Sequence, residues 1–385
     1  MLQSYEKFRS VRFFGSLDGL RALSIVAVMW LHAWWETPYY ARLEAIPVLR
    51  QGFYGVQVFF VVSGFLITTL LLREMEKYGT ISLRDFYIRR ALRIWPLYYA
   101  VLGIYVVNAL VFERGTQRAA SFLHYLPSFA TFTYTWFLSA NWPGGMFNLA
   151  WTLSTEEQFY FFWPVVLRIL RGIWSAAVIV GLIALKLATD YHLTDQVLPP
   201  GWLPTRIVQS IAIPICLGVL LGQALHRERG FRLIYRVLGW KWSAPVMLVA
   251  MLACLAPARP PWLVAFLATT ALVGACVVRE DNGLAWLLRL RPVAFVGTVS
   301  YGMYLLNSLC LHGVRAVLRP VGVAYPAAIF VITLGVTVAI AYLSHRYYES
   351  RFLALKERFS RLRAVPVKQA RVKIGTGDVS APTHP

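Results

Sequence analysis

The chain has 385 residues, of which 58% are hydrophobic and 15% are charged. This composition excludes an ordinary soluble domain and indicates a protein that crosses a membrane several times. The 38 Lys and Arg residues outnumber the 18 Asp and Glu residues, so the formal net charge is +20. Because the basic residues are spread over several loops and the C-terminal tail, they predict contact with anionic lipid headgroups and no nucleic-acid partner.

Ten apolar stretches are long enough to cross the hydrocarbon core of a bilayer, for which a helix needs about 20 residues. They predict an all-α polytopic membrane protein with ten transmembrane helices. The first stretch is too long for a cleaved signal peptide and lacks a small-residue cleavage pattern, so we expect it to remain as an anchor. The ten stretches are residues 17–36, 53–72, 94–112, 147–167, 172–189, 206–225, 242–257, 262–278, 293–313 and 323–345.

The basic residues also predict the orientation of the chain. If the N-terminus is cytoplasmic, 28 of the 38 Lys and Arg residues fall in cytoplasmic segments and 8 in outer ones. This strong positive-inside bias predicts that both termini are cytoplasmic. Residues 122–139 are also apolar, but they include His124 and Pro127, and a span here would invert every later loop against the bias. We therefore expect a re-entrant or interfacial segment on the outer side.

Composition divides the chain into three parts. Residues 1–16 form a basic cytoplasmic arm, residues 17–352 carry the apolar stretches, and residues 353–385 form a basic cytoplasmic tail. The polar composition of the tail predicts disorder. All four cysteines lie in apolar stretches without paired or metal-ligand spacing, so we expect packing roles and no metal site. They are Cys216, Cys254, Cys276 and Cys310.

Two ionisable side chains lie in the first apolar stretch, where such groups are costly and usually functional. Arg21 and His32 are eleven residues apart. On a helix this spacing puts them on one face, separated by a rise of about 16 Å. Asp18, three residues before Arg21 on the same face, can hold the guanidinium in place. The alternative without a functional role is an arginine that snorkels to the surface and a histidine that is hydrogen-bonded in the core.

A cluster of arginines lies where the third apolar stretch begins. Arg89, Arg90 and Arg93 are neighbours on a helix and would repel one another unless an anion lies among them. Guanidinium groups favour bidentate contacts with phosphate. An ordinary positive-inside anchor is the alternative. The depth that we expect for Arg21, at the same inner surface, favours a binding site.

The fourth apolar stretch begins with a polar run on the expected outer side. Glu156 and Tyr160 share a helix face, and a carboxylate beside His32 could fix its tautomer and raise its basicity for general-base catalysis. The alternative is an acidic helix N-terminus at the interface. We expect Glu156 to be functional and Glu157 to be solvated. Gln57, in the second stretch, could line a polar cavity.

These segments together resemble the bacterial acyltransferase family 3 integral membrane proteins, which include O-antigen, peptidoglycan, Nod-factor and exopolysaccharide O-acetyltransferases. The resemblance runs in order from about residue 16 to residue 352, so five motifs in register carry it. The motifs are Leu17–Ala22 with His32, Gly55–Thr68, Arg89–Arg93 with Pro96, Trp151–Tyr160 and Ser300–Leu305.

The resemblance implies roles for the residues in these motifs. It implies that Arg21 and His32 are essential, that the arginine cluster serves the acyl-CoA donor, and that Glu156 is functionally important. Many relatives have His where this chain has Asn307, so no general-base role transfers to that position. We also expect no counterpart here of the extracytoplasmic SGNH esterase-like domain that some relatives carry after their last helices. We therefore expect acceptor chemistry in the membrane domain or on a separate extracytoplasmic partner.

The residues and the resemblance together predict an O-acyltransferase in the bacterial inner membrane. We expect acetyl-CoA or another acyl-CoA as donor substrate, no permanently bound cofactor, and a cell-envelope or exported polysaccharide, or its lipid-linked precursor, as acceptor. His32 is expected to act as a base or as a transient acyl carrier. Two alternatives stay open. One is a small secondary metabolite as acceptor, and the other is a transporter or flippase for an anionic lipid-linked substrate.

Overall fold

The computed structural model describes residues 2–359 except residues 12, 36, 38, 138–144, 258, 323 and 324. All regular secondary structure in this part of the chain is helical. Five helices are long and apolar enough to cross a membrane, or up to eight if each bent pair of helices is one span. The all-α multi-pass prediction is therefore confirmed. The count of ten spans and the side on which the termini lie stay predictions.

Each predicted apolar stretch overlaps one of the longer helices. They are α2 (Gly15–Trp34), α4 (Tyr54–Tyr78), α5 (Leu83–Val107), α8 (Ala150–Ile169), α9 (Ile173–Asp190), α11 (Ile213–His226), α13 (Ser243–Leu255), α14 (Trp262–Val278), α16 (Arg291–Leu318) and α17 (Pro326–Ser344). The lower count of spans has a physical reason. Helices α11, α13 and α14 have 14, 13 and 17 residues, and α8 carries a polar first half.

Short helices connect the longer ones. They are α1 (Leu2–Ser10), α3 (Pro47–Arg50), α6 (Gln117–His124), α7 (Leu126–Ala130), α10 (Leu203–Gln209), α12 (Glu228–Leu238), α15 (Ala285–Leu288) and α18 (Ser350–Glu357). Three of them form bent pairs with longer helices, since α1 meets α2 at 66°, α10 meets α11 at 53° and α12 meets α13 at 76°. The predicted non-spanning segment is broken into α6, α7 and a 3-10 turn at Tyr134–Trp136, so no single helix there is long enough to span. Its last residue, Ser139, lies outside the described residues.

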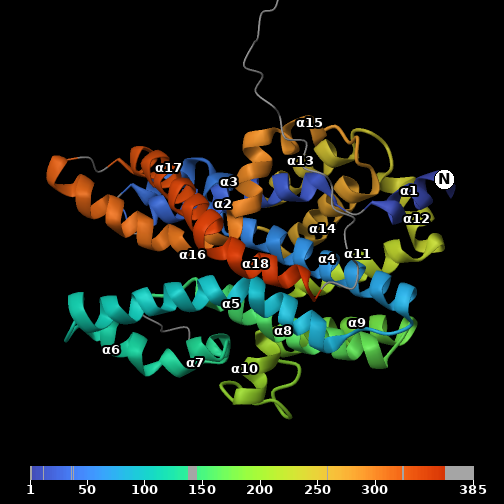
Figure 1. The fold of residues 1–385 in the computed structure, drawn as a ribbon, viewed down its shortest axis with the longest axis horizontal. Coiled ribbons are helices and arrows are strands. Elements are labelled where there is room, and N and C mark those ends of the chain that lie inside the picture. Colours follow the sequence, from blue (N-terminus) through green and yellow to red (C-terminus); the bar gives the residue numbers. More distant parts are fainter. Residues whose placement is uncertain are drawn as a thin grey trace, which may run out of the picture.

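The helices are arranged in two layers with α4 and α11 between them (Figure 1). Helices α5 to α10 lie on one side, and α2 and α13 to α17 lie on the other. Helix α4 packs against α2, α8, α11 and α14, and α11 packs against α4, α9 and α14. The central pair therefore ties the two layers together and is covered on both sides.

Glycines allow the closest helix contacts. A Cβ on Gly64 would overlap the carbonyl of Ile215, and one on Gly218 would overlap the carbonyl of Val61, so α4 and α11 meet backbone to backbone. A Cβ on Gly297 would overlap the carbonyl of Asp18 in the same way, which brings α16 against α2. These contacts fix the positions of the helices that carry the candidate site residues.

The expected N-terminal arm is partly helical and packed. The rings of Tyr5 and Phe8 on α1 lie 5.3 Å from the ring of Phe231 on α12. Arg73 at the end of α4 donates hydrogen bonds to the carbonyls of Phe8 and Val11. The arm is therefore attached to the same end of the bundle as the arginine cluster of α5.

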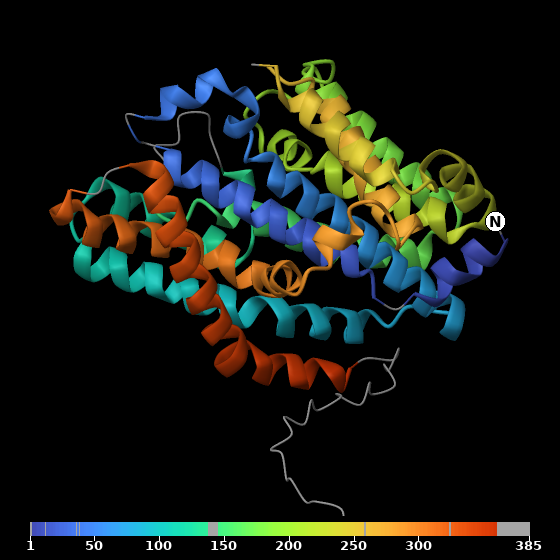
Figure 2. The same ribbon diagram turned by 90° about the horizontal axis from the view of Figure 1, so that it is seen from above.

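The C-terminal part of the chain is ordered beyond residue 352, where we expected the tail to begin. Helix α17 continues through a π-helical segment at His345–Glu349 into α18. Figure 2 shows α18 lying alongside α5, and the two helices are in contact. Residues 360–385, which include most of the predicted tail, lie outside the described residues.

Candidate active site

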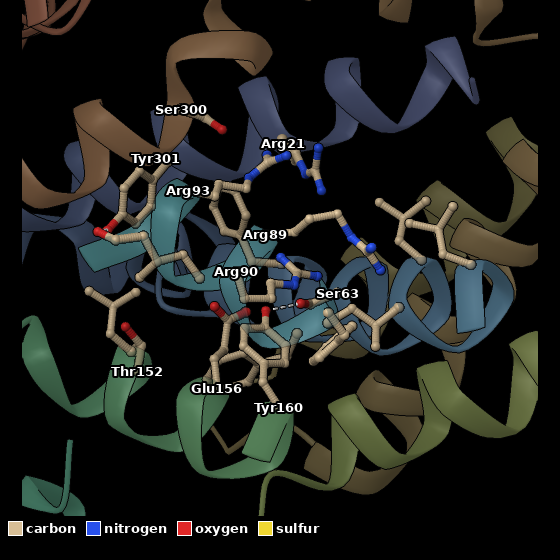
Figure 3. Close-up of a pocket in the computed structure, with 18 of the residues that line it drawn as sticks. Arg21, Ser63, Arg89, Arg90, Arg93, Thr152, Glu156, Tyr160, Ser300 and Tyr301 are labelled. Atoms are coloured by element: carbon tan, nitrogen blue, oxygen red, sulfur yellow. Dashed lines mark hydrogen bonds between the residues drawn. The ribbon is translucent and has the colours of Figure 1, made fainter. Parts of the chain in front are cut away.

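A cavity of about 330 Å³ lies between the two layers and holds most of the predicted site residues. Ligand pockets in proteins fall in the range of about 300–1,000 Å³. The cavity receives side chains from α2, α4, α5, α8, α16 and α18. We call it the basic cavity, because five of its lining residues are cationic: Arg21, Arg89, Arg90, Arg93 and Lys356. Figure 3 shows the four arginines on one side and Glu156 and Tyr160 of α8 facing them.

Two of the arginines are held by carboxylates. Arg89 lies 3.2 Å from the Glu74 carboxylate and also donates a hydrogen bond of 2.7 Å to the carbonyl of Phe359. Glu74 is itself buried and accepts a second hydrogen bond from the backbone N–H of Ser82. Arg21 lies 3.2 Å from the Asp18 carboxylate, as the spacing predicts. Both guanidinium groups are therefore fixed in direction before any ligand arrives.

The other two arginines have no ion-pair partner within the described residues. Arg90 lies over the ring of Tyr160, with its guanidinium carbon 4.4 Å from the ring centroid. The Tyr160 hydroxyl is hydrogen-bonded to Ser63, which fixes the ring that supports Arg90. Arg93 lines the cavity with an exposed side chain. Of the carboxylates, only Glu74 and Glu156 line this cavity in the described part of the chain, so its basic groups outnumber its acidic ones. Such a site attracts anions.

His32 lies outside the lining of the basic cavity and has a different partner from the one we expected. Its Nδ1 lies 2.9 Å from the side-chain oxygen of Asn307 on α16. The Asn307 amide nitrogen donates a hydrogen bond to the carbonyl of Tyr304, so its oxygen can only accept from His32. Nδ1 therefore carries the proton, and Nε2 of the neutral ring carries the lone pair. Glu156 does not contact His32.

One helical turn separates this pair from the basic cavity. Tyr304, whose carbonyl holds Asn307, lines the cavity with its side chain and accepts a hydrogen bond of 2.8 Å from Thr152. Arg315 follows Asn307 on α16. It donates hydrogen bonds to the carbonyls of His32 and Ala33 at the end of α2. Helix α16 thus holds both the side chain and the backbone of the histidine.

Two further predictions concerned the surroundings of Gln57 and Glu157. Gln57 is buried, with 5% of its surface exposed, but it does not line the basic cavity. The expectation that Glu157 is solvated is wrong, because one of its oxygens accepts a hydrogen bond from Trp95 and the other is buried without a partner. Glu157 therefore points toward α5, which carries Trp95.

Sequence reasoning missed four residues that the structure places at these sites. Asn307 looked uninformative because it replaces a histidine of relatives, although its amide suits a histidine partner. Ser63 lay in a motif that indicated only helix packing, and Glu74 was an isolated acid among basic residues. Lys356 lay in the presumed tail. No group of three or more His, Cys, Asp or Glu residues in the described part of the chain could hold a metal ion.

Comparisons with known proteins agree with the geometry of the site. Residues 14–346 match the acyltransferase domain family, acyltransferase 3. The putative peptidoglycan O-acetyltransferase YrhL of Bacillus subtilis is 30% identical over 322 aligned positions, which cover 78% of this chain and 49% of that protein. The peptidoglycan O-acetyltransferase OatA of Listeria monocytogenes is 27% identical over 365 aligned positions, which cover 89% of this chain and 56% of that protein.

A putative O-acetyltransferase of Staphylococcus aureus is 24% identical over 385 aligned positions, which cover 91% of this chain and 59% of that protein. The chain therefore spans about half the length of the curated relatives that it matches. No solved structure matches it. Because the family match covers most of the chain, including Arg21, His32, the arginine cluster and Glu156, the chain belongs to the acyltransferase 3 family of membrane proteins.

Proposed function

We propose that the chain is an O-acyltransferase of the bacterial inner membrane that moves an acyl group from acyl-CoA to a hydroxyl of a cell-envelope saccharide or its lipid-linked precursor. Acetyl-CoA is the simplest donor. The observation that carries this proposal is a cavity rich in arginines whose wall residue Tyr304 leads directly to the Asn307–His32 pair. The names of the relatives, which are peptidoglycan O-acetyltransferases or putative O-acetyltransferases, support a saccharide acceptor.

The basic cavity suits the phosphate groups of the donor. Glu74 and Asp18 already direct Arg89 and Arg21, whereas Arg90 and Arg93 have no carboxylate partner in the described part of the chain. Guanidinium groups form short, charge-assisted hydrogen bonds with phosphate oxygens. We assign Glu156 to this cavity, where it offsets part of the arginine charge beside Tyr160. The donor nucleotide binds at the arginines, and its acyl end extends toward Tyr304.

His32 supplies the base. Its Nε2 accepts the proton of the acceptor hydroxyl as that oxygen forms a bond to the thioester carbonyl carbon. Collapse of the tetrahedral adduct breaks the carbon–sulfur bond, and the imidazolium returns the proton to the departing thiolate. The products are the O-acyl ester and free CoA thiol. Asn307 keeps the Nδ1–H tautomer in place, so that Nε2 is the atom that exchanges the proton.

An acyl-carrier role for His32 differs by one covalent intermediate. In that route Nε2 attacks the thioester itself, releases CoA and passes the acyl group to the acceptor in a second step. Mass spectrometry of protein mixed with acetyl-CoA in the absence of acceptor distinguishes the routes. An acetyl adduct on the α2 peptide indicates the carrier route, and CoA release only in the presence of acceptor indicates direct transfer.

The test of the function is CoA thiol release from acetyl-CoA by purified protein in nanodiscs, with envelope glycan as acceptor. We expect glycan-dependent release by the wild type and a loss of about 10²- to 10⁴-fold in His32→Ala, which is the range of general-base catalysis. His312→Ala is the matched control, because His312 is an exposed histidine bonded to a backbone carbonyl of its own helix. Its activity should equal that of the wild type.

The same assay addresses the transport alternative. A transporter or flippase for an anionic lipid-linked substrate predicts no CoA release with acetyl-CoA or with longer acyl-CoAs. Silence of a folded wild-type protein with a competent acceptor preparation contradicts the acyltransferase proposal. Equal release of CoA by the wild type and His32→Ala contradicts the role given to His32 but not the proposal of acyl transfer.

A further inference from the structure

Helix α18 lies outside the part of the chain that matches the family, since the match ends at residue 346 and α18 spans Ser350–Glu357. It nevertheless contributes to the basic cavity, because Lys356 is one of the lining residues. The helix reaches this position by continuing from α17 through the π-helical segment and turning along α5. Figure 2 shows this path from α17 to the side of α5.

Specific contacts hold α18 against the cavity. The Tyr348 hydroxyl, just before α18, donates a hydrogen bond of 3.1 Å to the carbonyl of Pro96 on α5. Glu349 accepts a hydrogen bond of 3.0 Å from Ser344, which stabilises the π-helical turn. At the other end of α18, the carbonyl of Phe359 accepts a hydrogen bond from Arg89. The segment is therefore attached to α5 both before and after Lys356.

The contact with Arg89 links α18 to the arginine cluster itself. Arg89 divides its guanidinium between the Glu74 carboxylate and the Phe359 carbonyl. A Phe359 carbonyl at 2.7 Å holds the chain directly beside an arginine that we assign to donor phosphate. Lys356, three residues earlier, lines the same cavity as Arg89.

We propose that α18 is part of the donor site and that Lys356 binds a phosphate group of the nucleotide end of acyl-CoA. This inference rests on the proposed function and extends it to a helix beyond the family match. An ammonium group adds a compact charge with three donors to a cluster of planar guanidinium groups. A donor with several phosphates gains from such a mixed cluster, because one lysine can follow a phosphate that the fixed arginines do not reach.

The kinetic test uses two donors, acetyl-CoA and S-acetyl-N-acetylcysteamine, which carries the thioester but no phosphate. For Lys356→Gln we expect the KM for acetyl-CoA to rise about tenfold, the factor for one charge-assisted hydrogen bond. We expect kcat to be unchanged, and both constants for the phosphate-free donor to equal those of the wild type. Lys356→Arg should restore most of the affinity. Arg351→Gln is the matched control, because Arg351 is an exposed cation on the same helix that does not line the cavity.

A binding measurement separates this inference from the proposed function. Adenosine 3′,5′-bisphosphate is the probe, and its Kd for Lys356→Gln should be about tenfold above those of the wild type and Arg351→Gln. This result supports the inference even if the wild type releases no CoA, an outcome that contradicts the proposed function alone. Equal Kd values for all three proteins overturn the inference, as does an equal loss of activity with both donors, which indicates a purely structural role.

Discussion

The basic cavity and the His32 pair differ in how they use charge. The cavity gathers charged side chains from α2, α4, α5, α8 and α18, and it orients two of its arginines with carboxylates. The His32 side chain is held by one neutral amide from α16 and contacts no carboxylate among the described residues. An anionic donor is attracted by net positive charge, whereas a base needs a defined tautomer and a free lone pair. This difference matches the roles that we propose, donor binding for the cavity and chemistry for His32.

Removing Arg93 should produce the largest effect on the cavity. Arg93→Ala takes away a cation that has no ion-pair partner in the described part of the chain, so its loss is not offset by a freed carboxylate. We expect the KM for acetyl-CoA to rise about 10- to 100-fold. Steady-state CoA release measures it, and Arg84→Ala on the exposed side of α5 is the control. A fall in kcat with an unchanged KM would place Arg93 in the chemical step and contradict the separate roles of the two regions.

Asn307→Ala tests the other region. Without the amide, Nδ1 of His32 has no fixed partner and the productive tautomer is no longer selected. We expect kcat to fall about tenfold, the factor for a lost hydrogen bond of this kind in a buried site, while the Kd of adenosine 3′,5′-bisphosphate is unchanged. Asn148→Ala, an exposed asparagine before α8, should behave as wild type. Loss of nucleotide binding in Asn307→Ala would mean that the two regions are not separate.

A smaller effect is expected at the hydrogen bond between Ser63 and Tyr160. Ser63→Ala and Tyr160→Phe should each raise the KM for acetyl-CoA about threefold, because the ring that supports Arg90 loses its fixed position. The double variant should be no weaker than either single variant, since both changes remove one interaction. Additive losses would show that the two side chains act independently on the donor.

The smallest effect is expected at an exposed ion pair outside both regions. The Arg279 guanidinium holds the pKa of the Asp281 carboxyl below its ordinary value through two hydrogen bonds of 3.0 and 2.9 Å. This contribution to stability is present above the ordinary pKa of Asp and is lost as the pH falls through the lowered one. Asp281→Asn should destabilise the protein by less than about 1 kcal/mol at pH 7 and leave activity unchanged. Thermal unfolding of the wild type and Asp281→Asn at neutral and acidic pH measures this stabilisation. A stability difference between the two proteins that grows in acid would contradict the prediction.

The sequence predicts contacts within a helix better than contacts between helices. The ion pair of Asp18 with Arg21 follows from a spacing of three residues, because such neighbours meet on any helix. The meeting of Arg21 with the arginines of α5 follows from a common expected depth at one membrane surface. Neither argument predicts the hydrogen bond between His32 and Asn307. These residues are 275 positions apart in the sequence, and the packing of α2 on α16 brings them together.

Polar residues at helix ends were the hardest to predict. Composition alone assigned Lys356 to a tail, because the number of apolar residues falls before the helix ends. The turn of the chain through the π-helical segment, which sends α18 back along α5, leaves no local signal of its own. Glu157 was misplaced for a related reason, since an acid near an expected membrane surface is usually solvated and only the packing of α5 on α8 buries it.

The close contact between α2 and α16 keeps Arg21 and His32 at a fixed distance from each other. Gly297 lies against the carbonyl of Asp18, beside Arg21, and the same two helices meet again at His32 and Asn307. The distance from the arginine to the histidine is therefore that of eleven residues of rigid helix, about 16 Å. In the function that we propose, a donor whose thioester lies much closer to its phosphates cannot reach His32 while its phosphates stay bound. Among donors that carry phosphates, the length of the arm therefore decides which thioesters are used.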